Sequence, residues 1–426
     1  MTEKLAIEGG TPAKTTPEPP MYPGAMEISE EEKRAVCEVL EDKILFRYHH
    51  REGRKPRVAE FEEKFAAHVG AGHALAVNSG TSALISALVG AGIGPGDEVI
   101  IPAYTFVATP AAVIAAKAIP VIAEVDDSLT LDPGDFERNI TEHTKAVIPV
   151  HMRGAPSDMD RIMGIARGHG IQVIEDSAQA VGAGYRGRRL GTFGKAGCFS
   201  LQMSKVITSG EGGVMITDDQ ELYEKARMYH DAAVRFWDQD AGMPAFPGVN
   251  FRMSEVTGAL ALVQLFRLEG LLARMRANKA RIKGQIERRD GLRFRTIHDE
   301  QGDAAVCLIF YLPDADLAKR FAEALRAEGV GAGTIYDQGI PDRHIYTAWA
   351  EVLTQSPDVQ KGCPFTCPYY KGKVQYSKDM CPQTLDYLGR AIHINISPLL
   401  TCQDCDAIAH GINKVSRALL GNKVSS

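Results

Sequence analysis

Apolar residues recur along this chain at two spacings, one typical of buried strands and the other of helices. Short apolar runs suited to buried strands occupy residues 73–77, 98–101, 119–123, 146–150 and 171–174. Stretches with a helical pattern lie between them, as in 84–89 and 109–114. Strands that alternate with helices favour a mostly parallel sheet packed between helices, so we predict an α/β protein.

The two ends of the chain do not follow this alternation. Residues 1–25 are rich in proline, which indicates an extended arm on the surface. Near the other end, 317–329 has the pattern of an amphipathic helix closed by a glycine, and 391–397 alternates like a half-buried strand. We therefore expect three regions, namely an N-terminal arm at 1–30, a large domain at 31–270 and a smaller α+β domain at 271–426.

The composition is that of an ordinary globular enzyme, with 45% hydrophobic and 24% charged residues among 426. A net charge of -6 gives no reason to expect a nucleic-acid or anionic membrane partner. No uninterrupted apolar run reaches membrane-spanning length, and the first ten residues are too polar for a signal peptide. These features together predict a cytoplasmic protein.

Two polar residues stand where cofactor chemistry would need them. Lys205 lies between an apolar stretch and the Gly210–Gly213 turn, where partial desolvation would lower its pKa and free the amine to form a Schiff base. Taken alone, this segment also fits a solvated surface lysine. Asp176 ends a buried strand, the position at which open α/β sheets place ligand-binding groups. Pyridoxal phosphate requires a lysine for its aldehyde and an acidic partner for its ring nitrogen, and these residues supply that pair.

A phosphate site is predicted where the strand 73–77 meets the next helix. The turn between them reads Ser79-Gly-Thr-Ser82. Backbone N–H groups of Thr81 and Ser82 at a helix N-terminus would point at a bound anion, and their hydroxyls could add hydrogen bonds.

Six segments occur in an order that resembles one known family. They are Ser79–Leu84, Pro102–Thr109, Glu175–Gln179, Phe199–Lys205, Gly210–Gly213 and Asn250–Glu255. Together they are similar to the DegT/DnrJ/EryC1/StrS family of pyridoxal-phosphate-dependent sugar aminotransferases. The resemblance implies the fold type I of such transferases, in which a mostly parallel seven-stranded sheet lies between helices and a smaller α+β C-terminal domain follows.

The resemblance also assigns roles to residues of this chain. Lys205 and Asp176 become the catalytic pair, and Asn250 would reach the cofactor phosphate of a neighbouring subunit, which implies a homodimer with shared active sites. Phe106 would stack on the cofactor ring, with Tyr104 as the alternative. The implied cofactor-binding residues are Gly80, Thr81, Ser82, Phe106, Asp176, Gln179, Ser200, Lys205 and Asn250. Of these, Gln179 would contact the ring oxygen, and Ser200 and Thr81 would hold the phosphate.

Substrate contacts are predicted from polar residues outside these motifs. The segment 44–57 interleaves five basic residues and two histidines with Phe46 and Tyr48, which indicates either a loop that attracts an anionic substrate or a solvated basic loop. The substrate candidates are Arg47, Tyr48, His151 and His230. His151 ends a strand, so it lines the site or merely caps that strand.

The expected activity is transamination of a keto or aldehyde group of a sugar or cyclitol, with glutamate or glutamine as the donor. A dehydratase or deoxygenase of the same family is an alternative, but such relatives have histidine where Lys205 stands. A non-catalytic regulatory protein that binds the cofactor is a second alternative.

Five late cysteines raise the question of a metal site. They lack the regular paired spacing of a zinc ribbon, so we expect no metal, with zinc or a redox pair as the alternative. Most of them lie in 354–382, which we predict to be an irregular insertion that could shape substrate choice. The five are Cys363, Cys367, Cys381, Cys402 and Cys405.

Overall fold

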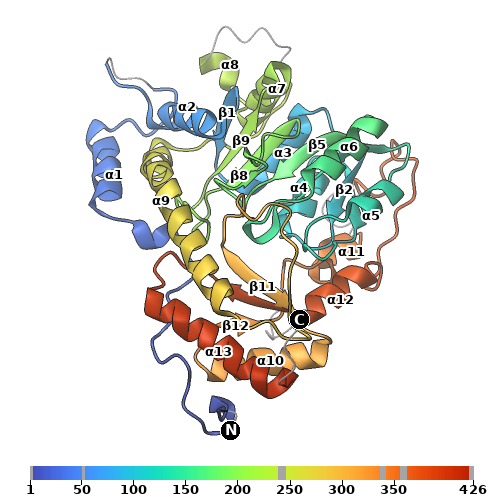
Figure 1. The fold of residues 1–426 in the computed structure, drawn as a ribbon. Helices are drawn as coiled ribbons and strands as arrows, with labels where there is room; N and C mark the ends of the chain where they lie inside the picture. Colours follow the sequence, from blue (N-terminus) through green and yellow to red (C-terminus); the bar gives the residue numbers. More distant parts are fainter. Residues whose placement is uncertain (1–2, 50–52, 238–245, 336–341, 356–361, 422–426) are drawn as a thin grey trace.

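A computed structural model describes residues 3–49, 53–237, 246–335, 342–355 and 362–421 of the chain (Figure 1). Its centre is a seven-stranded sheet with the strand order β1-β9-β8-β5-β4-β2-β3. Strands β8 to β3 of this order run parallel, whereas β9 is antiparallel to both β8 and β1. The predicted mostly parallel seven-stranded sheet is confirmed. The strands are β1 (His73–Val77), β2 (Glu98–Pro102), β3 (Ile119–Ala123), β4 (Thr144–Val147), β5 (Gln172–Asp176), β8 (Ala196–Ser200) and β9 (Gly213–Thr217).

Helices pack around this sheet (Figure 1). Helix α3 contacts β8, β9, α4 and α7, and most of its residues are buried. Its sequence is accordingly apolar on every side rather than along one stripe. The helices of this region are α2 (Arg57–Val69), α3 (Gly80–Gly90), α4 (Ala108–Ala115), α5 (Pro133–Arg138), η3 (Met152–Gly154), α6 (Met159–His169), α7 (Gln220–His230) and α8 (Val234–Trp237), and a ribbon of β6 (Gly184–Tyr185) and β7 (Arg188–Arg189) lies among them.

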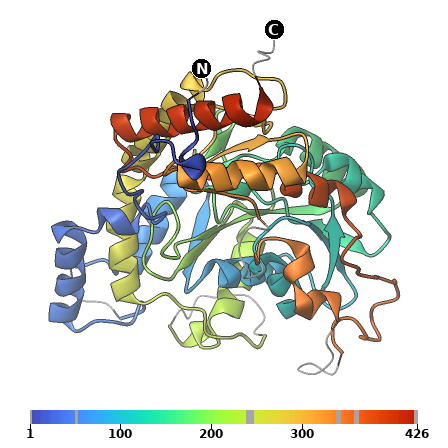
Figure 2. The same ribbon diagram turned by 90° about the horizontal axis from the view of Figure 1, so that it is seen from below.

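A four-stranded antiparallel sheet forms the smaller C-terminal part, with the order β10-β11-β13-β12. Helices α10 and α13 contact each other and lie side by side at the end of the molecule remote from the large sheet (Figures 1 and 2). The expected amphipathic helix and alternating strand correspond to α10 and β13. The elements are β10 (Arg293–Phe294), β11 (Cys307–Tyr311), α10 (Ala315–Ala327), β12 (Ala332–Gly333), η4 (Tyr346–Ala348), α11 (Ala350–Leu353), α12 (Pro382–Arg390), β13 (Ala391–Asn395) and α13 (Cys402–Leu420).

Helix α9 (Glu255–Gln285) connects the two parts, because it packs on α2 near one end and contacts α13 as well. It crosses residue 270 without interruption, and the expected division of the chain at 30 and 270 remains a prediction. Within the described ranges, α9 is the one helix long and apolar enough to span a membrane. Half of its apolar window is buried inside the protein, as in the core helix of many globular proteins.

The N-terminal segment reaches both parts of the molecule. It contains η1 (Ala6–Glu8) and η2 (Ala25–Glu27), and then α1 (Glu30–Asp42) begins at a capping box formed by Ser29 and Glu32. Backbone N–H groups of Ala6 and Ala13 donate to the Glu328 carboxylate at the end of α10. Further along, the N–H of Gly24 donates to the carbonyl of Lys205 at 3.3 Å. The segment is therefore tied to the small sheet region at one end and to the Lys205 loop at the other.

The late insertion contains no helix or strand between residues 362 and 381, as expected; residues 356–361 lie outside the described part of the chain. It packs on the large sheet at the start of two strands. The Tyr370 hydroxyl donates to Glu98 of β2 at 2.6 Å, and the Tyr376 hydroxyl donates to the carbonyl of Pro120 in β3 at 2.6 Å. These are the amino ends of parallel strands, opposite the edge at which α/β sheets bind ligands. The expectation that this insertion shapes substrate choice is not supported by these contacts.

Candidate active site

The carboxyl ends of β5 and β8 and the turn after β1 face a cavity of about 550 Å³. Side chains from the N-terminal segment, η3 and the small part of the molecule complete its wall. The site therefore depends on segments that are far apart in the sequence. Seven of the residues predicted to bind the cofactor line it, namely Gly80, Thr81, Phe106, Asp176, Gln179, Ser200 and Lys205.

Asp176 is fixed at the end of β5 and is only 5% exposed. The hydroxyl of Thr109 donates to its Oδ2 at 2.8 Å, and the N–H of Ala178 donates to its Oδ1 at 3.1 Å. Burial raises the pKa of Asp176, and these two hydrogen bonds oppose that shift. A cationic group bound in the cavity would favour the ionised carboxylate. Asp176 thus has the surroundings of a group that holds a proton on a ligand nitrogen.

Lys205 follows β8. Its Nζ atom forms no hydrogen bond or ion pair with any residue in the described part of the chain. Burial lowers its pKa; the nearby Asp176 opposes this effect, while the charge of Arg153 adds to it. A lysine in this state has a larger fraction of free amine at neutral pH than a solvated one. It can therefore act as a nucleophile towards a carbonyl group.

The turn before α3 brings the backbone close to the end of β8. A Cβ atom on Gly80 would lie 2.8 Å from Cβ of Ser200, so only glycine fits this approach. The Ser79 side chain caps α3 by accepting the N–H of Ser82 at 3.1 Å, and the Ser82 hydroxyl donates to Asn78 at 2.6 Å. Ser82 therefore supports the turn and does not face the cavity, in contrast to its predicted role in phosphate binding. Of the residues predicted to bind the cofactor, Gly80, Thr81 and Ser200 line this corner of the cavity, together with Ser79.

The aromatic wall of the cavity is formed by Phe106, which is 41% exposed. Its ring lies against His344, with 5.2 Å between the ring centroids. The predicted alternative, Tyr104, is fully buried, and its hydroxyl accepts a hydrogen bond from Nε of Arg153 at 3.3 Å. Phe106 is therefore the better placed of the two rings to stack on a ligand. Gln179 lies on the same cavity, with Oε1 accepting the N–H of Arg153 at 3.1 Å.

Comparison with known proteins establishes the family. The sequence pattern of the DegT/DnrJ/EryC1/StrS aminotransferase family matches residues 26–364. This chain belongs to that family. It is accordingly an aminotransferase, and the resemblance inferred from six short segments is confirmed.

Relatives and solved structures agree with this assignment. Spore coat polysaccharide biosynthesis protein SpsC of Bacillus subtilis (strain 168) is 32% identical over 397 residues, covering 91% of this chain and 95% of that protein. L-glutamine:2-deoxy-scyllo-inosose aminotransferase of Micromonospora echinospora is 40% identical over 288 residues, covering 65% and 67%. GDP-perosamine synthase of Caulobacter vibrioides is 44% identical over 223 residues, covering 51% and 58%. The crystal structure of 3-amino-5-hydroxybenzoic acid synthase is 27% identical, with a TM-score of 0.77, and covers 95% of this chain and 100% of that one. The predicted fold type I is confirmed.

Two predicted substrate residues of this aminotransferase are buried away from the cavity. His151 is fully buried, with Nε2 bonded to Glu175 at 3.1 Å and Nδ1 accepting the N–H of Ser157 at 3.1 Å. His230 is fully buried at the end of α7, and burial lowers its pKa to about 3. Neither imidazole faces the site, so both predictions are corrected by the structure. Both side chains serve packing rather than ligand contact.

Arg47 and Tyr48 also lie outside the lining of this cavity. Arg47 binds both carboxylate oxygens of Glu62, at 2.8 and 2.9 Å, and donates to the carbonyl of Ala76 at 3.0 Å. Tyr48 stacks on Trp237, with 6.2 Å between the ring centroids and 15° between the planes. Both residues therefore have structural contacts within this chain, and neither lines the cavity.

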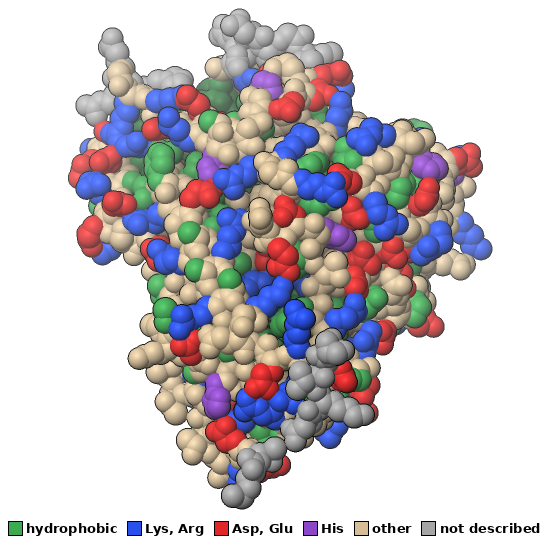
Figure 3. Space-filling view, in the orientation of Figure 1, with side chains coloured by type: hydrophobic (Ala, Val, Ile, Leu, Met, Phe, Trp, Pro, Cys, Tyr) green, Lys and Arg blue, Asp and Glu red, His purple; other side chains and the backbone are tan. Residues whose placement is uncertain are grey.

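The described cations of the segment 44–57 are neutralised by carboxylates of the same chain. Arg54 pairs with Asp42 and Glu38, Arg57 pairs with Glu38 and Glu60, and Lys55 pairs with Glu63. On the face shown in Figure 3, basic and acidic side chains are likewise interspersed. The predicted anion-attracting loop is therefore not supported by the described residues; residues 50–52 lie outside them.

Asn250 is exposed and does not belong to the lining of the cavity in its own chain. It forms an isolated β-bridge with Asp231, and its Oδ1 accepts the N–H of Arg252 at 3.3 Å. Its predicted contact with a cofactor in a neighbouring subunit stays a prediction.

Among the residues at the site that sequence reasoning missed, three have polar side chains close to the catalytic pair or the aromatic wall. Thr109 supports Asp176 from the start of α4, and Arg153 and His344 line the cavity directly. Thr109 follows Phe106 by three residues, a spacing that would have placed it on the same side of a helix. Arg153 stands two residues after His151 in a left-handed backbone conformation (φ 56°), which only the structure reveals. Among the described residues, no group of three or more His, Cys, Asp or Glu side chains is arranged to hold a metal ion.

Proposed function

We propose that this aminotransferase converts a keto or aldehyde group of a sugar or cyclitol into an amine, with glutamate or glutamine as the amino donor. The names of its relatives support this range of acceptors, since they include a perosamine synthase and a scyllo-inosose aminotransferase that uses glutamine. The observation that carries the proposal is the common cavity of Lys205 and Asp176, bordered by the N-terminus of α3. We also propose that the protein is cytoplasmic and has no nucleic-acid or membrane partner.

The residues of the cavity fit pyridoxal phosphate. Gly80 and Thr81 at the start of α3, with the Ser200 hydroxyl beside them, suit the phosphate group, because a helix N-terminus offers free N–H donors to an anion. Asp176 suits the ring nitrogen, and Phe106 offers an aromatic face to the ring. When bound, this cofactor supplies an aldehyde and an electron-withdrawing ring that stabilises negative charge on the carbon bearing the amino group.

Each catalytic residue then holds or transfers a proton at a defined atom. Asp176 holds the proton on the ring nitrogen, and Thr109 orients the carboxylate by donating to Oδ2. The amine of Lys205 would take a proton from the amino-bearing carbon of the donor and deliver one to the former aldehyde carbon of the cofactor, on the other side of the amino nitrogen, as a general base and then a general acid. Burial of Lys205 favours the base form required for the first transfer. A lysine in this cavity argues against the dehydratase or deoxygenase alternative.

We further propose a homodimer with shared active sites, since Asn250 is exposed and does not line the cavity of its own chain. An exposed Phe266 on α9, at 69%, adds an apolar side chain to the surface available for a partner. Analytical ultracentrifugation would test the dimer. A monomer at micromolar concentration that retains full activity would exclude shared sites.

The proposed activity can be followed by absorbance. Protein loaded with pyridoxal phosphate should absorb in the visible range, and adding glutamate or glutamine should shift the spectrum. A keto-cyclitol or keto-sugar should then reverse the shift, with formation of the amine. Lys205→Ala should abolish both changes. If neither donor alters the spectrum of the wild-type protein, the proposed donors are wrong.

A further inference from the structure

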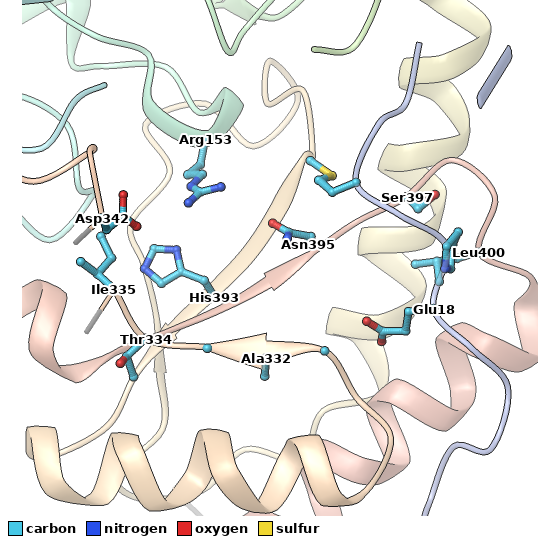
Figure 4. Close-up of a pocket in the computed structure, with 14 residues that line it drawn as sticks. Glu18, Arg153, Ala332, Thr334, Ile335, Asp342, His393, Asn395, Ser397 and Leu400 are labelled. Atoms are coloured by element: carbon cyan, nitrogen blue, oxygen red, sulfur yellow. The ribbon is translucent and has the colours of Figure 1, made fainter. Parts of the chain in front are cut away.

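A second cavity of about 300 Å³ adjoins the cofactor cavity and is not explained by cofactor binding (Figure 4). It lies between the N-terminal segment, η3 and the strands β12 and β13 of the small sheet. Met21 and Arg153 line both cavities, so the two spaces meet at these side chains. A molecule in the second cavity would therefore have one end at the reaction centre.

Several buried polar atoms of this cavity lack a hydrogen-bond partner within the described part of the chain. They are Oε1 of Glu18 and both ring nitrogens of His393. Figure 4 shows the side chains of Arg153, His393 and Asn395 directed towards a common space. Buried polar groups in native proteins are almost always hydrogen-bonded, so unpartnered ones in a cavity indicate a polar ligand or ordered water.

The lining of the second cavity contains both hydrogen-bond donors and hydrogen-bond acceptors. Burial lowers the pKa of His393 well below its usual range, and the charges of Arg153 and Arg295 act in the same direction. The ring is therefore neutral and presents one donor and one acceptor. Asn395 also presents both, Arg153 donates, and the Glu18 carboxylate accepts. Hydroxyl groups are the ligand groups that donate and accept at the same time, so this set matches a polyhydroxylated ring.

The charges of the same residues disfavour a diphosphate. Arg153 is the one Lys or Arg side chain among the described lining residues, whereas Glu18 and Asp342 contribute two carboxylates. Phosphate groups are held by clusters of Arg, Lys and N–H donors, and carboxylates beside them would be repulsive. The volume is also at the lower end of the range for small-molecule sites.

We propose that the second cavity binds the hydroxyl-bearing ring of a free keto-cyclitol or keto-sugar, without an attached nucleotide, with Arg153 at the junction donating to the oxygen substituents nearest the reacting carbon. This inference rests on the proposed aminotransferase function and specifies its acceptor. Asn395, His393 and Glu18 are the residues that select the ring.

The two half-reactions test this assignment separately from the function itself. With glutamine or glutamate, the spectral change of the loaded enzyme reports the donor half-reaction alone. With the amino form of the loaded enzyme, 2-deoxy-scyllo-inosose and a GDP-linked keto-sugar serve as free and nucleotide-linked probes. We expect the wild-type protein to react at least roughly tenfold faster with the free probe, since the carboxylates of Glu18 and Asp342 would repel the diphosphate of the GDP-linked probe. Glu18→Gln and Asn395→Leu should slow only the acceptor half-reaction, by roughly tenfold or more.

Gln403→Ala, on the exposed side of α13, is the matched control and should change neither half-reaction. Binding of 2-deoxy-scyllo-inosose measured by calorimetry gives a readout besides turnover and should weaken in the Glu18 and Asn395 variants. A faster reaction with the GDP-linked probe, or unchanged acceptor rates and binding in both variants, would overturn the assignment of this cavity. A wild-type protein without a donor half-reaction would instead contradict the proposed function.

Discussion

The hydroxyl of Thr109 donates to Oδ2 of Asp176 at 2.8 Å, and this bond joins the first turn of α4 to the end of β5. A second hydroxyl, that of Thr105, lies 2.7 Å from Thr109 Oγ1. All three side chains are buried. The orientation and ionisation of the predicted catalytic carboxylate thus depend on a residue 67 positions earlier in the chain.

Thr109→Val should therefore alter the pH dependence of the enzyme. Burial raises the pKa of Asp176, and the Thr109 hydroxyl opposes this shift, so removing the hydroxyl raises the pKa further. On acidification the Asp176 carboxylate then becomes protonated at a higher pH. The acid limb of the kcat/KM profile should therefore move to higher pH. Loss of one hydrogen bond to a charged group corresponds to about 1.5–3 kcal/mol. Thr15→Val, at an exposed position, is the control and should leave the profile unchanged.

Asp176→Asn tests the carboxylate itself. The amide cannot hold a proton on the ring nitrogen, so at least about 2–3 kcal/mol of transition-state stabilisation should disappear, comparable with the loss of other preorganised electrostatic partners. The expected result is a fall in kcat of roughly 100-fold, measured with saturating pyridoxal phosphate. A variant that retained more than half of the wild-type kcat would remove Asp176 from the mechanism.

Gly80→Ala tests the close approach between α3 and β8. The new Cβ would lie 2.8 Å from Cβ of Ser200, which forces a shift of the turn and should cost about 1–3 kcal/mol of stability. The affinity for pyridoxal phosphate, followed by absorbance titration, should fall as well. Gly164→Ala in α6 is the matched control, because no atom lies within 4 Å of its added Cβ. It should be neutral or raise stability by up to about 1 kcal/mol. Equal behaviour of the two variants would exclude the packing argument.

Arg47→Met distinguishes a structural role of this arginine from substrate binding. The Arg47 and Glu62 side chains are 8% and 13% exposed, so the variant leaves a nearly buried carboxylate without its partner. Removal of one member of a buried pair should lower the free energy of unfolding by about 3 kcal/mol, seen in chemical denaturation. Arg47→Met combined with Glu62→Gln should recover much of that loss. An acceptor KM that rises with unchanged stability would restore Arg47 as a substrate residue.

The local pattern of residues in the sequence was sufficient to predict the main structural elements of this protein. The apolar runs predicted β1 to β5 of the large sheet, because a strand buried on both faces requires a continuous apolar run. Asp176 was recognisable because it ends such a run, where open α/β sheets bind ligands, and Lys205 because it stands between an apolar stretch and a glycine turn. The ordered motifs then sufficed to identify the family.

Only the tertiary structure decided which polar residues meet. Arg47, His151 and His230 carry groups suited to substrate contact, but each is engaged elsewhere in the fold. Arg153 lines both cavities because folding brings the N-terminal segment and the small sheet next to it. A charge or an imidazole acts on whatever lies within a few ångströms, and that distance is set by folding rather than by separation along the chain.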